Sequence, residues 1–324
     1  VMENALIYLT ISALSFPFLS VYNACAALFR SMGNSKVTLK VSILINLINV
    51  VGNAVCIFGL HMGAAGVAIP SLISRAAGSI ILYFLLKNPR LDICFLKEPF
   101  HLDFGMVKKI LYIGIPSGVE NGIFQLGRVL VVSIISSFGT VQIAANGVAN
   151  NLDSVGVLIG GAINLAMITV IGQCVGAGDE KQIRSYTKKL LLIAYIPTII
   201  LNLVLFLNLG WILDLYGLSP ETTSLARTLI FIHNGCACLL WPLSFTFPNM
   251  LRACNDVRYT MVVSIASMFI FRIGFSYLIG ANLGYGAIGV WIAMVLDWIC
   301  RVICFLVRYR RGKWRVLAGL ADLS

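Results

Sequence analysis

Long apolar stretches separated by short polar connections run along the whole chain. Each stretch is close to the ~20 residues that a helix needs to cross the hydrocarbon core of a bilayer. Nine of them can be marked, at approximately residues 5–28, 41–60, 64–86, 110–138, 144–174, 190–212, 226–250, 260–280 and 287–307. Helices satisfy all backbone polar groups within one segment, so the pattern predicts an all-α polytopic membrane protein with nine transmembrane helices.

Composition supports this prediction. Hydrophobic residues make up 59% of the chain and charged residues 11%, against roughly 45–50% and 25% in a soluble domain. Most of the 24 basic residues fall in every second connection and in the C-terminal tail. This alternation predicts cytoplasmic basic connections and a cytoplasmic C-terminus. The net charge of +11 is therefore assigned to membrane orientation, and nucleic acid is not expected as a partner.

An internal repeat divides the chain. The segment around Arg30 and Gly33 returns 222 positions later around Arg252, and residues 63–67 return as 286–290. We expect two parallel copies of a multi-helix unit, the first of them incomplete. The chain is thus interpreted as helices four to twelve of a twelve-helix protein. The expected divisions are half of an N-terminal bundle (1–88), a cytoplasmic linker (89–109), a complete six-helix bundle (110–312) and a cytoplasmic tail (313–324).

Three carboxylates, Glu120, Asp153 and Asp297, fall inside apolar segments. Each costs ~2.5–3.5 kcal/mol at membrane depth and needs a reason to be there. Glu120 follows Pro116 and Gly118, which are expected to loosen the helix around it. A coupling role for Glu120 competes with an ion pair to an arginine of another helix, for instance Arg272. Asp297 precedes Arg301 by one turn, a spacing that favours a structural ion pair.

Asp153 shares a helix face with Asn146 and Asn150. Such a polar stripe faces either a water-filled cavity or the hydrogen-bonded interior of a bundle, and both alternatives stand. His233 and Asn234 lie in the middle of the seventh apolar segment, where a buried histidine is more often a packing residue than a proton carrier.

No catalytic or cofactor motif is present. The chain contains no His-Glu-x-x-His, no Gly-x-Ser-x-Gly and no Walker lysine motif, and no enzymatic activity is expected. The nine cysteines fall mainly in apolar segments and match no zinc pattern, so free thiols and no metal are expected.

Three segments resemble the multidrug and toxic compound extrusion (MATE) transporters. Gly172, Gln173, Gly176 and Gly178 resemble the Gly-Gln-x-x-Gly-Ala loop of this family. The two repeated arginine segments look like its Leu-Arg-Gly-x-Gly segments, and residues 116–120 resemble the opening of its seventh helix. A tight reversal at residues 172–179, with Gly176 and Gly178 as its flexible positions, is expected from the glycines.

The resemblance implies two six-helix bundles that export cationic or amphipathic compounds against inward flow of Na⁺ or H⁺. It implies a monomer in the cell membrane with no bound cofactor. Coupling is expected at Glu120 and Asp153, and the candidate substrate cavity comprises Asn121, Gln125, Asn146, Asn150 and Asn234. Many members carry a second carboxylate on helix ten, which this chain lacks, so Asp153 or Asn234 is expected to substitute.

A lipid-linked oligosaccharide flippase of the same superfamily is the alternative. It would need a basic cleft to hold pyrophosphate, and four intramembrane arginines are available for one: Arg75, Arg128, Arg272 and Arg301.

Overall fold

The computed structural model of the chain describes residues 2–91, 93 and 102–320, and it separates into two compact units, residues 1–101 and 102–324. Much of the connection expected at 89–109 lies outside the described residues, as do the last residues of the expected tail. Nine helical stretches of the described residues are long and apolar enough to cross a membrane. The predicted all-helical polytopic class is confirmed.

The described residues of the first unit contain four α-helices. They are α1 (Met2–Leu14), α2 (Phe16–Ser31), α3 (Ser35–Ala54), which continues as the π-helical turn η1 (Val55–Gly59), and α4 (Ala65–Leu85). Helix α4 packs against the other three. Helix α4 can approach α3 closely because residue 52 of α3 is a glycine. A Cβ atom on Gly52 would lie 2.7 Å from Cβ of Pro70 on α4.

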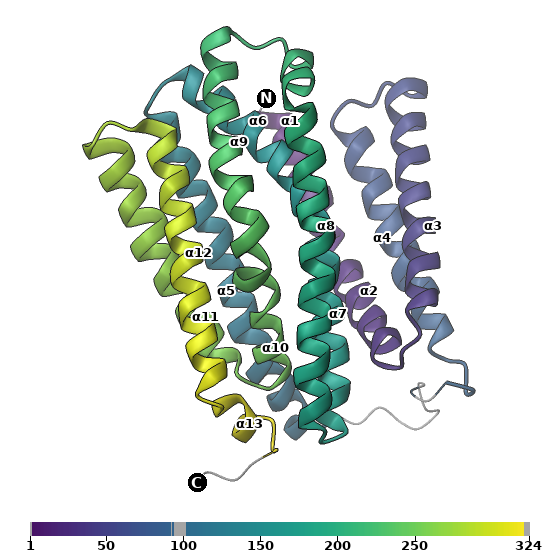
Figure 1. Cartoon of the computed structure of the whole chain (residues 1–324). Helices are drawn as coiled ribbons and strands as arrows, with labels where there is room; N and C mark the ends of the chain where they lie inside the picture. Colours follow the sequence, from purple (N-terminus) through teal and green to yellow (C-terminus); the bar gives the residue numbers. More distant parts are fainter. Residues whose placement is uncertain (1, 92, 94–101, 321–324) are drawn as a thin grey trace. The chain divides into compact units, whose positions relative to one another are not determined.

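The second unit opens with long helices joined by short turns. These are α5 (Phe104–Ser136), α6 (Thr140–Gly156), α7 (Leu158–Gly176) and α8 (Glu180–Leu215). Figure 1 shows the axes of α5, α8 and the later α9 and α12 roughly parallel, with α9 and α12 running opposite to α5 and α8. The stretch predicted as one span at 144–174 is broken at Val157, which belongs to neither α6 nor α7.

The remaining spans contain π-helical segments. Helix α9 (Pro220–Trp241) continues through η2 (Pro242–Thr246) into α10 (Pro248–Ala253). Helix α11 (Val257–Ser267) continues through η3 (Met268–Gly274) and η4 (Ser276–Asn282), and α12 (Gly286–Arg310) and the short α13 (Lys313–Leu317) follow. Pro242 and Pro248 lack the backbone donor that regular helix requires, which accounts for the change of winding around η2.

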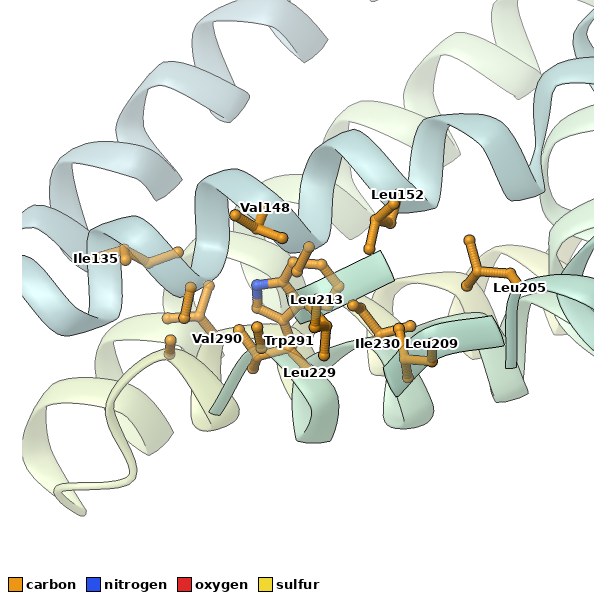
Figure 2. Packing of buried hydrophobic residues seen from close by; sticks show 14 of the residues in the cluster. Ile135, Val148, Leu152, Leu205, Leu209, Leu213, Leu229, Ile230, Val290 and Trp291 are labelled. Atoms are coloured by element: carbon orange, nitrogen blue, oxygen red, sulfur yellow. The ribbon is translucent and has the colours of Figure 1, made fainter. Parts of the chain in front are cut away.

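The end of the second unit where α8 meets α9 has an apolar core around Trp291. Figure 2 shows Trp291 among aliphatic side chains of five helices, α5, α6, α8, α9 and α12. Trp291 is fully buried and its indole nitrogen donates to Oδ1 of Asn146 at 3.0 Å. A large side chain can be buried at this depth because its one polar group has a partner.

The repeated arginine segments adopt the same local backbone. Gly33 has φ +74° and its counterpart Asn255 has φ +64°. Asn34 N donates to Phe29 O at 2.9 Å, and Asp256 N donates to Leu251 O at the same distance. Both turns end a helix in the left-handed conformation that glycine and asparagine adopt most readily.

The reversal between α7 and α8 depends on one glycine. Helix α7 ends at Gly176, and Gly178 has φ +69°. Asp179 caps α8 by accepting a hydrogen bond from Gln182 N at 2.9 Å. Gly176 itself is helical and a Cβ atom there would meet nothing within 4 Å. The expectation that Gly176 provides flexibility is therefore wrong, and Gly178 alone has the strained conformation.

Candidate functional site

Glu120 is paired with an arginine from another helix of the same unit. Nη2 of Arg252 lies 2.6 Å from Oε1 of Glu120, while Nη1 of Arg252 donates to Asn249 Oδ1 at 2.6 Å. Glu120 is buried, and its Oε2 atom has no hydrogen-bond partner among the described residues. The ion-pair alternative is thus realised with Arg252 rather than with Arg272, which lies against Asp297.

The helix around Glu120 is not loosened. Helix α5 runs without interruption from Phe104 to Ser136 and includes Pro116 and Gly118. The surroundings of Gly118 are open, since a Cβ atom there would meet nothing within 4 Å. The expected break beside Glu120 is absent, because one missing donor and one glycine do not outweigh the remaining hydrogen bonds of a 33-residue helix.

Asp153 lies beside the break that does occur. It is in the last turn of α6, and its backbone oxygen accepts from Val157 N at 3.2 Å. Its Oδ1 atom lies 3.0 Å from Nδ1 of His233 on α9. This is ion-pair distance, although the atoms do not have the alignment of a directed hydrogen bond, and the Nε2 atom of His233 has no described partner.

Two indole rings enclose His233. Its ring centroid lies 4.7 Å from that of Trp291 and 4.4 Å from that of Trp298, and the residue is 1% exposed. The Asp153 side chain retains 20% exposure. The pair therefore has one fully buried partner and one partner that is partly exposed at the surface of the second unit.

The asparagines expected in a substrate cavity divide into two groups. Asn146 accepts from Trp291 and from Asn150 Nδ2 at 3.0 Å, and Asn234 donates to Asn202 Oδ1 at 2.7 Å. Both Asn146 and Asn234 are buried. These two residues belong to the hydrogen-bonded interior and do not line a cavity here, because their side chains already serve interior partners.

Asn202 is a member of this interior network that sequence reasoning missed. Its amide also donates to Gly156 O at 3.3 Å, beside the helix break, and to Thr198 O at 2.8 Å. A Cβ atom on Gly156 would lie 2.5 Å from Asn202 Oδ1. The available signal was an asparagine in the middle of the apolar segment 190–212.

Asp297 forms a closed structural cluster. Arg301 Nε donates to Asp297 Oδ1 at 2.9 Å, Arg272 Nε lies 4.0 Å from Oδ2, and the Ser267 hydroxyl donates to Oδ1. Arg272 and Arg301 also lie over the Phe124 ring, at 5.1 and 5.4 Å from its centroid. The predicted ion pair of Asp297 with Arg301 is confirmed.

One face of α5 carries exposed polar residues. They recur at helical spacing and are Asn121, Gln125 and Arg128, with the half-buried Ser117 one turn before Asn121. Arg128 forms no ion pair with any described residue. Asn121 and Gln125 therefore lie where a ligand could reach them, unlike Asn146 and Asn234.

The remaining motif residues are at helix ends. Arg30 is in the last turn of α2, and Gly172 and Gln173 are in the last turns of α7. In the described part of the chain, no group of three or more His, Cys, Asp or Glu side chains could hold a metal ion.

An all-helical chain with nine candidate membrane spans in its described part and paired charges inside a helix bundle is a polytopic membrane protein of the transporter class. The MatE family model matches residues 116–278, about half of the chain. The chain belongs to the MatE family of transporters.

Several relatives agree with this assignment. The uncharacterized transporter YisQ of Bacillus subtilis is 30% identical over 307 residues, which are 91% of this chain and 66% of YisQ. A probable multidrug resistance protein NorM of Thermotoga maritima is 23% identical over 319 residues, 95% of this chain and 66% of NorM. The chain thus spans about two thirds of the length of these relatives.

Solved structures share the fold. A multidrug resistance MATE family transporter of the MOP superfamily in an outward-facing conformation has a TM-score of 0.82 at 18% identity, covering 92% of this chain and 66% of its own. A MOP superfamily transporter from Pyrococcus furiosus, described as having a binding pocket of reverse polarity, has a TM-score of 0.82 at 17% identity, covering 98% of this chain and 77% of its own.

Proposed function

We propose that this protein is a proton-coupled antiporter that exports small amphipathic compounds, and that the Asp153–His233 pair binds the coupling proton. Relatives named as probable multidrug resistance proteins support the export of drug-like compounds. The exposed polar face of α5, with Asn121 and Gln125, is the surface that we assign to substrate.

The observation that carries the proton assignment is the chemistry of the partners. Glu120 is paired with Arg252, and Asp297 with Arg301. A guanidinium stays charged at every physiological pH, so these pairs cannot exchange a proton through their cation. Asp153 faces an imidazole instead, the side chain that changes charge near neutral pH.

The location of the pair supports coupling. Asp153 is one turn before the break at Val157, and His233 is on the neighbouring helix α9. A proton that changes the attraction between these residues would alter the contact of α6 with α9 where α6 is discontinuous. Protons can bias two states of the transporter only through such a difference in affinity.

A proton also suits the site better than Na⁺. Hard cations prefer a shell of oxygen ligands, whereas His233 brings a nitrogen and two indole rings to Asp153. Glu120, the other coupling candidate, could bind a cation only after Arg252 withdraws, so we assign it to holding α5 and α10 together.

The test is transport by the full-length protein in proteoliposomes, with an imposed pH gradient or an imposed Na⁺ gradient. Asp153→Asn and His233→Gln should each abolish dye transport driven by the pH gradient. Dye exchange without a gradient should persist. Ser154→Ala is the matched control, because Ser154 is the exposed neighbour on the same helix.

Two results would overturn the assignment of proton coupling to this pair, and a third would reject drug export. Normal gradient-driven transport by Asp153→Asn would move coupling to another group, with Glu120→Gln as the next variant to test. Transport driven by Na⁺ at constant pH would reject proton coupling. Lack of any dye exchange in the wild-type protein would reject drug export itself.

We also propose that the protein lies in the cell membrane as a monomer with its basic connections and C-terminus in the cytoplasm. The charge alternation of the connections supports this orientation. A C-terminal fluorescent protein, which matures only in the cytoplasm of a bacterial host, tests the orientation, and size determination in detergent tests the monomer.

The arrangement of the arginines speaks against the flippase alternative. Arg272 and Arg301 are buried against Asp297, and Arg75 donates to Ser15 Oγ at 2.5 Å. Arg128 alone among these four is exposed and without an ion pair to a described residue. One exposed guanidinium does not make the basic cleft that pyrophosphate would need.

A further inference from the structure

A groove lies along the first turns of α5 in the second unit. Its volume is about 460 Å³, and its lining includes Phe104, Lys108, Leu111, Tyr112, Ile115 and Arg258. Arg258 comes from the first turn of α11, so two helices form the walls. The groove is separate from the Asp153–His233 pair, and its role does not depend on the proposed transport function.

The position of the groove relative to the bilayer follows from the length of α5 and from its apolar stretch. The helix has 33 residues, which is about 50 Å at ~1.5 Å per residue. The hydrocarbon core of a bilayer is ~30 Å thick and takes up about 20 of these residues. The apolar stretch of α5 begins at residue 110, so Lys108 lies at the boundary of the hydrocarbon core, Leu111 and Ile115 lie inside the core, and Phe104 lies beyond it.

Apolar side chains of the groove are exposed on both sides of this boundary. Phe104 is 77% exposed, Ile115 57% and Leu111 48%. They form a continuous surface along the groove rather than isolated residues. A lipid acyl chain can cover the part of this surface that lies inside the hydrocarbon core.

Two cations accompany this apolar surface. Lys108 and Arg258 are both exposed, and neither forms an ion pair with a described residue. The Arg258 guanidinium carbon lies 4.5 Å from the centroid of the Tyr112 ring, which holds the guanidinium over the groove. The nearby Asp103 carboxylate caps the start of α5, where it accepts hydrogen bonds from Gly105 N and Met106 N.

The order of these groups along α5 is that of a phospholipid. Lys108, Leu111 and Ile115 share one helix face. The cation lies nearer the start of α5, and the aliphatic side chains lie toward the hydrocarbon. We propose that the groove binds an anionic phospholipid. Its phosphate lies between Lys108 and Arg258, and one acyl chain covers Leu111 and Ile115.

The chemistry excludes weaker candidates for the occupant. A zwitterionic phospholipid would bring its own cation close to Lys108 and Arg258, which reduces the electrostatic gain. Each basic residue near an anionic headgroup adds electrostatic attraction. Two such residues and the apolar wall together favour a ligand with one net negative charge and a long chain.

The test uses the full-length protein purified in a neutral detergent and titrated with phosphatidylglycerol or phosphatidylcholine. Native mass spectrometry counts the lipid molecules that stay bound. The wild-type protein should retain phosphatidylglycerol at least tenfold better than the Lys108→Gln/Arg258→Gln double variant. Lys109→Gln is the matched control, because Lys109 is the adjacent exposed lysine and does not line the groove.

The apolar half of the site needs its own variant. Leu111→Asn keeps both cations and should lower phosphatidylglycerol retention, whereas a site for free anions would be unaffected. Inorganic phosphate at millimolar concentration should not displace the lipid. Displacement by phosphate would show an anion site without a lipid requirement and would overturn the proposal.

Equal retention by the double variant, or an equal loss with Lys109→Gln, would show unspecific surface charge and would also overturn it. Thermal unfolding in phosphatidylcholine checks that each variant is folded. If the double variant does not fold, Lys108→Gln alone carries the same comparison, since its exposed side chain has no ion pair to lose.

Discussion

Nη2 of Arg252 lies 2.6 Å from Oε1 of Glu120, a contact that ties the end of α10 to the middle of α5 across 132 positions of sequence. The repeat places Arg30 at the equivalent position of the first unit, where it forms no ion pair with any described residue. The two copies thus share a turn but differ in the role of its arginine.

The first prediction concerns this pair. Glu120→Gln or Arg252→Gln should each lower the free energy of unfolding by about 1–3 kcal/mol, because each leaves a partly buried charge without its partner. The double variant should be less destabilised than the sum of the two, with a coupling energy of at least ~0.5 kcal/mol. Unfolding of the full-length protein in detergent measures this, and strictly additive effects would contradict it.

The second prediction separates two glycines of one motif. Gly178→Ala should cost about 1–2 kcal/mol, because its φ of +69° is unfavourable for a side chain. Gly176→Ala should be neutral or slightly stabilising, since Gly176 is helical and has open space around it. Melting temperatures of the two variants decide the matter, and equal losses would show that the turn has another source of strain.

The third prediction concerns packing at the start of α7. A Cβ atom on Gly160 would lie 2.1 Å from Cζ3 of Trp241, whereas one on Gly161 would meet nothing within 4 Å. Gly160→Ala should therefore destabilise the protein by about 1–3 kcal/mol, because Trp241 must move. Gly161→Ala is the control. Unchanged stability of Gly160→Ala would mean that the indole has free space to rotate.

The fourth prediction uses Cys254, in the turn after α10. Burial raises the pKa of this thiol to about 12, and the charge of Asp256 adds to the effect. At pH 8 only about one thiol in 10⁴ would be ionised, and the residue is fully buried. Maleimide should leave Cys254 unmodified in the folded protein and modify it after denaturation, as peptide mass spectrometry would show.

The same shift has a consequence for stability. The folded-state pKa exceeds the ordinary value of 9.0, so the folded protein holds this proton more tightly than the unfolded chain. The contribution is complete below pH 9 and declines as pH rises toward 12. Cys254→Ser should therefore weaken the loss of stability in this alkaline range, and an unchanged alkaline profile would contradict the assignment.

The sequence alone determined the positions of the membrane helices. A bilayer demands about 20 apolar residues and internal hydrogen bonds from every span, so the apolar stretches were readable without knowledge of any contact. The repeat of the arginine segment was also visible in the sequence, whereas the left-handed conformation that Gly33 and Asn255 share was found only in the structure. The ion pair of Asp297 with Arg301 followed from spacing within one helix.

Tertiary structure decided which residues meet. The partner of Glu120 is Arg252 and not Arg272, and the partner of Asp153 is His233 on another helix. Asn146 and Asn234 turn into the interior, while Asn121 and Gln125 stay exposed. Hydropathy determines whether a segment crosses the membrane. The rotation of each helix about its axis and the depth of each helix in the bilayer depend on packing against all neighbouring helices. Those two quantities determine every contact between helices, and no single segment contains them.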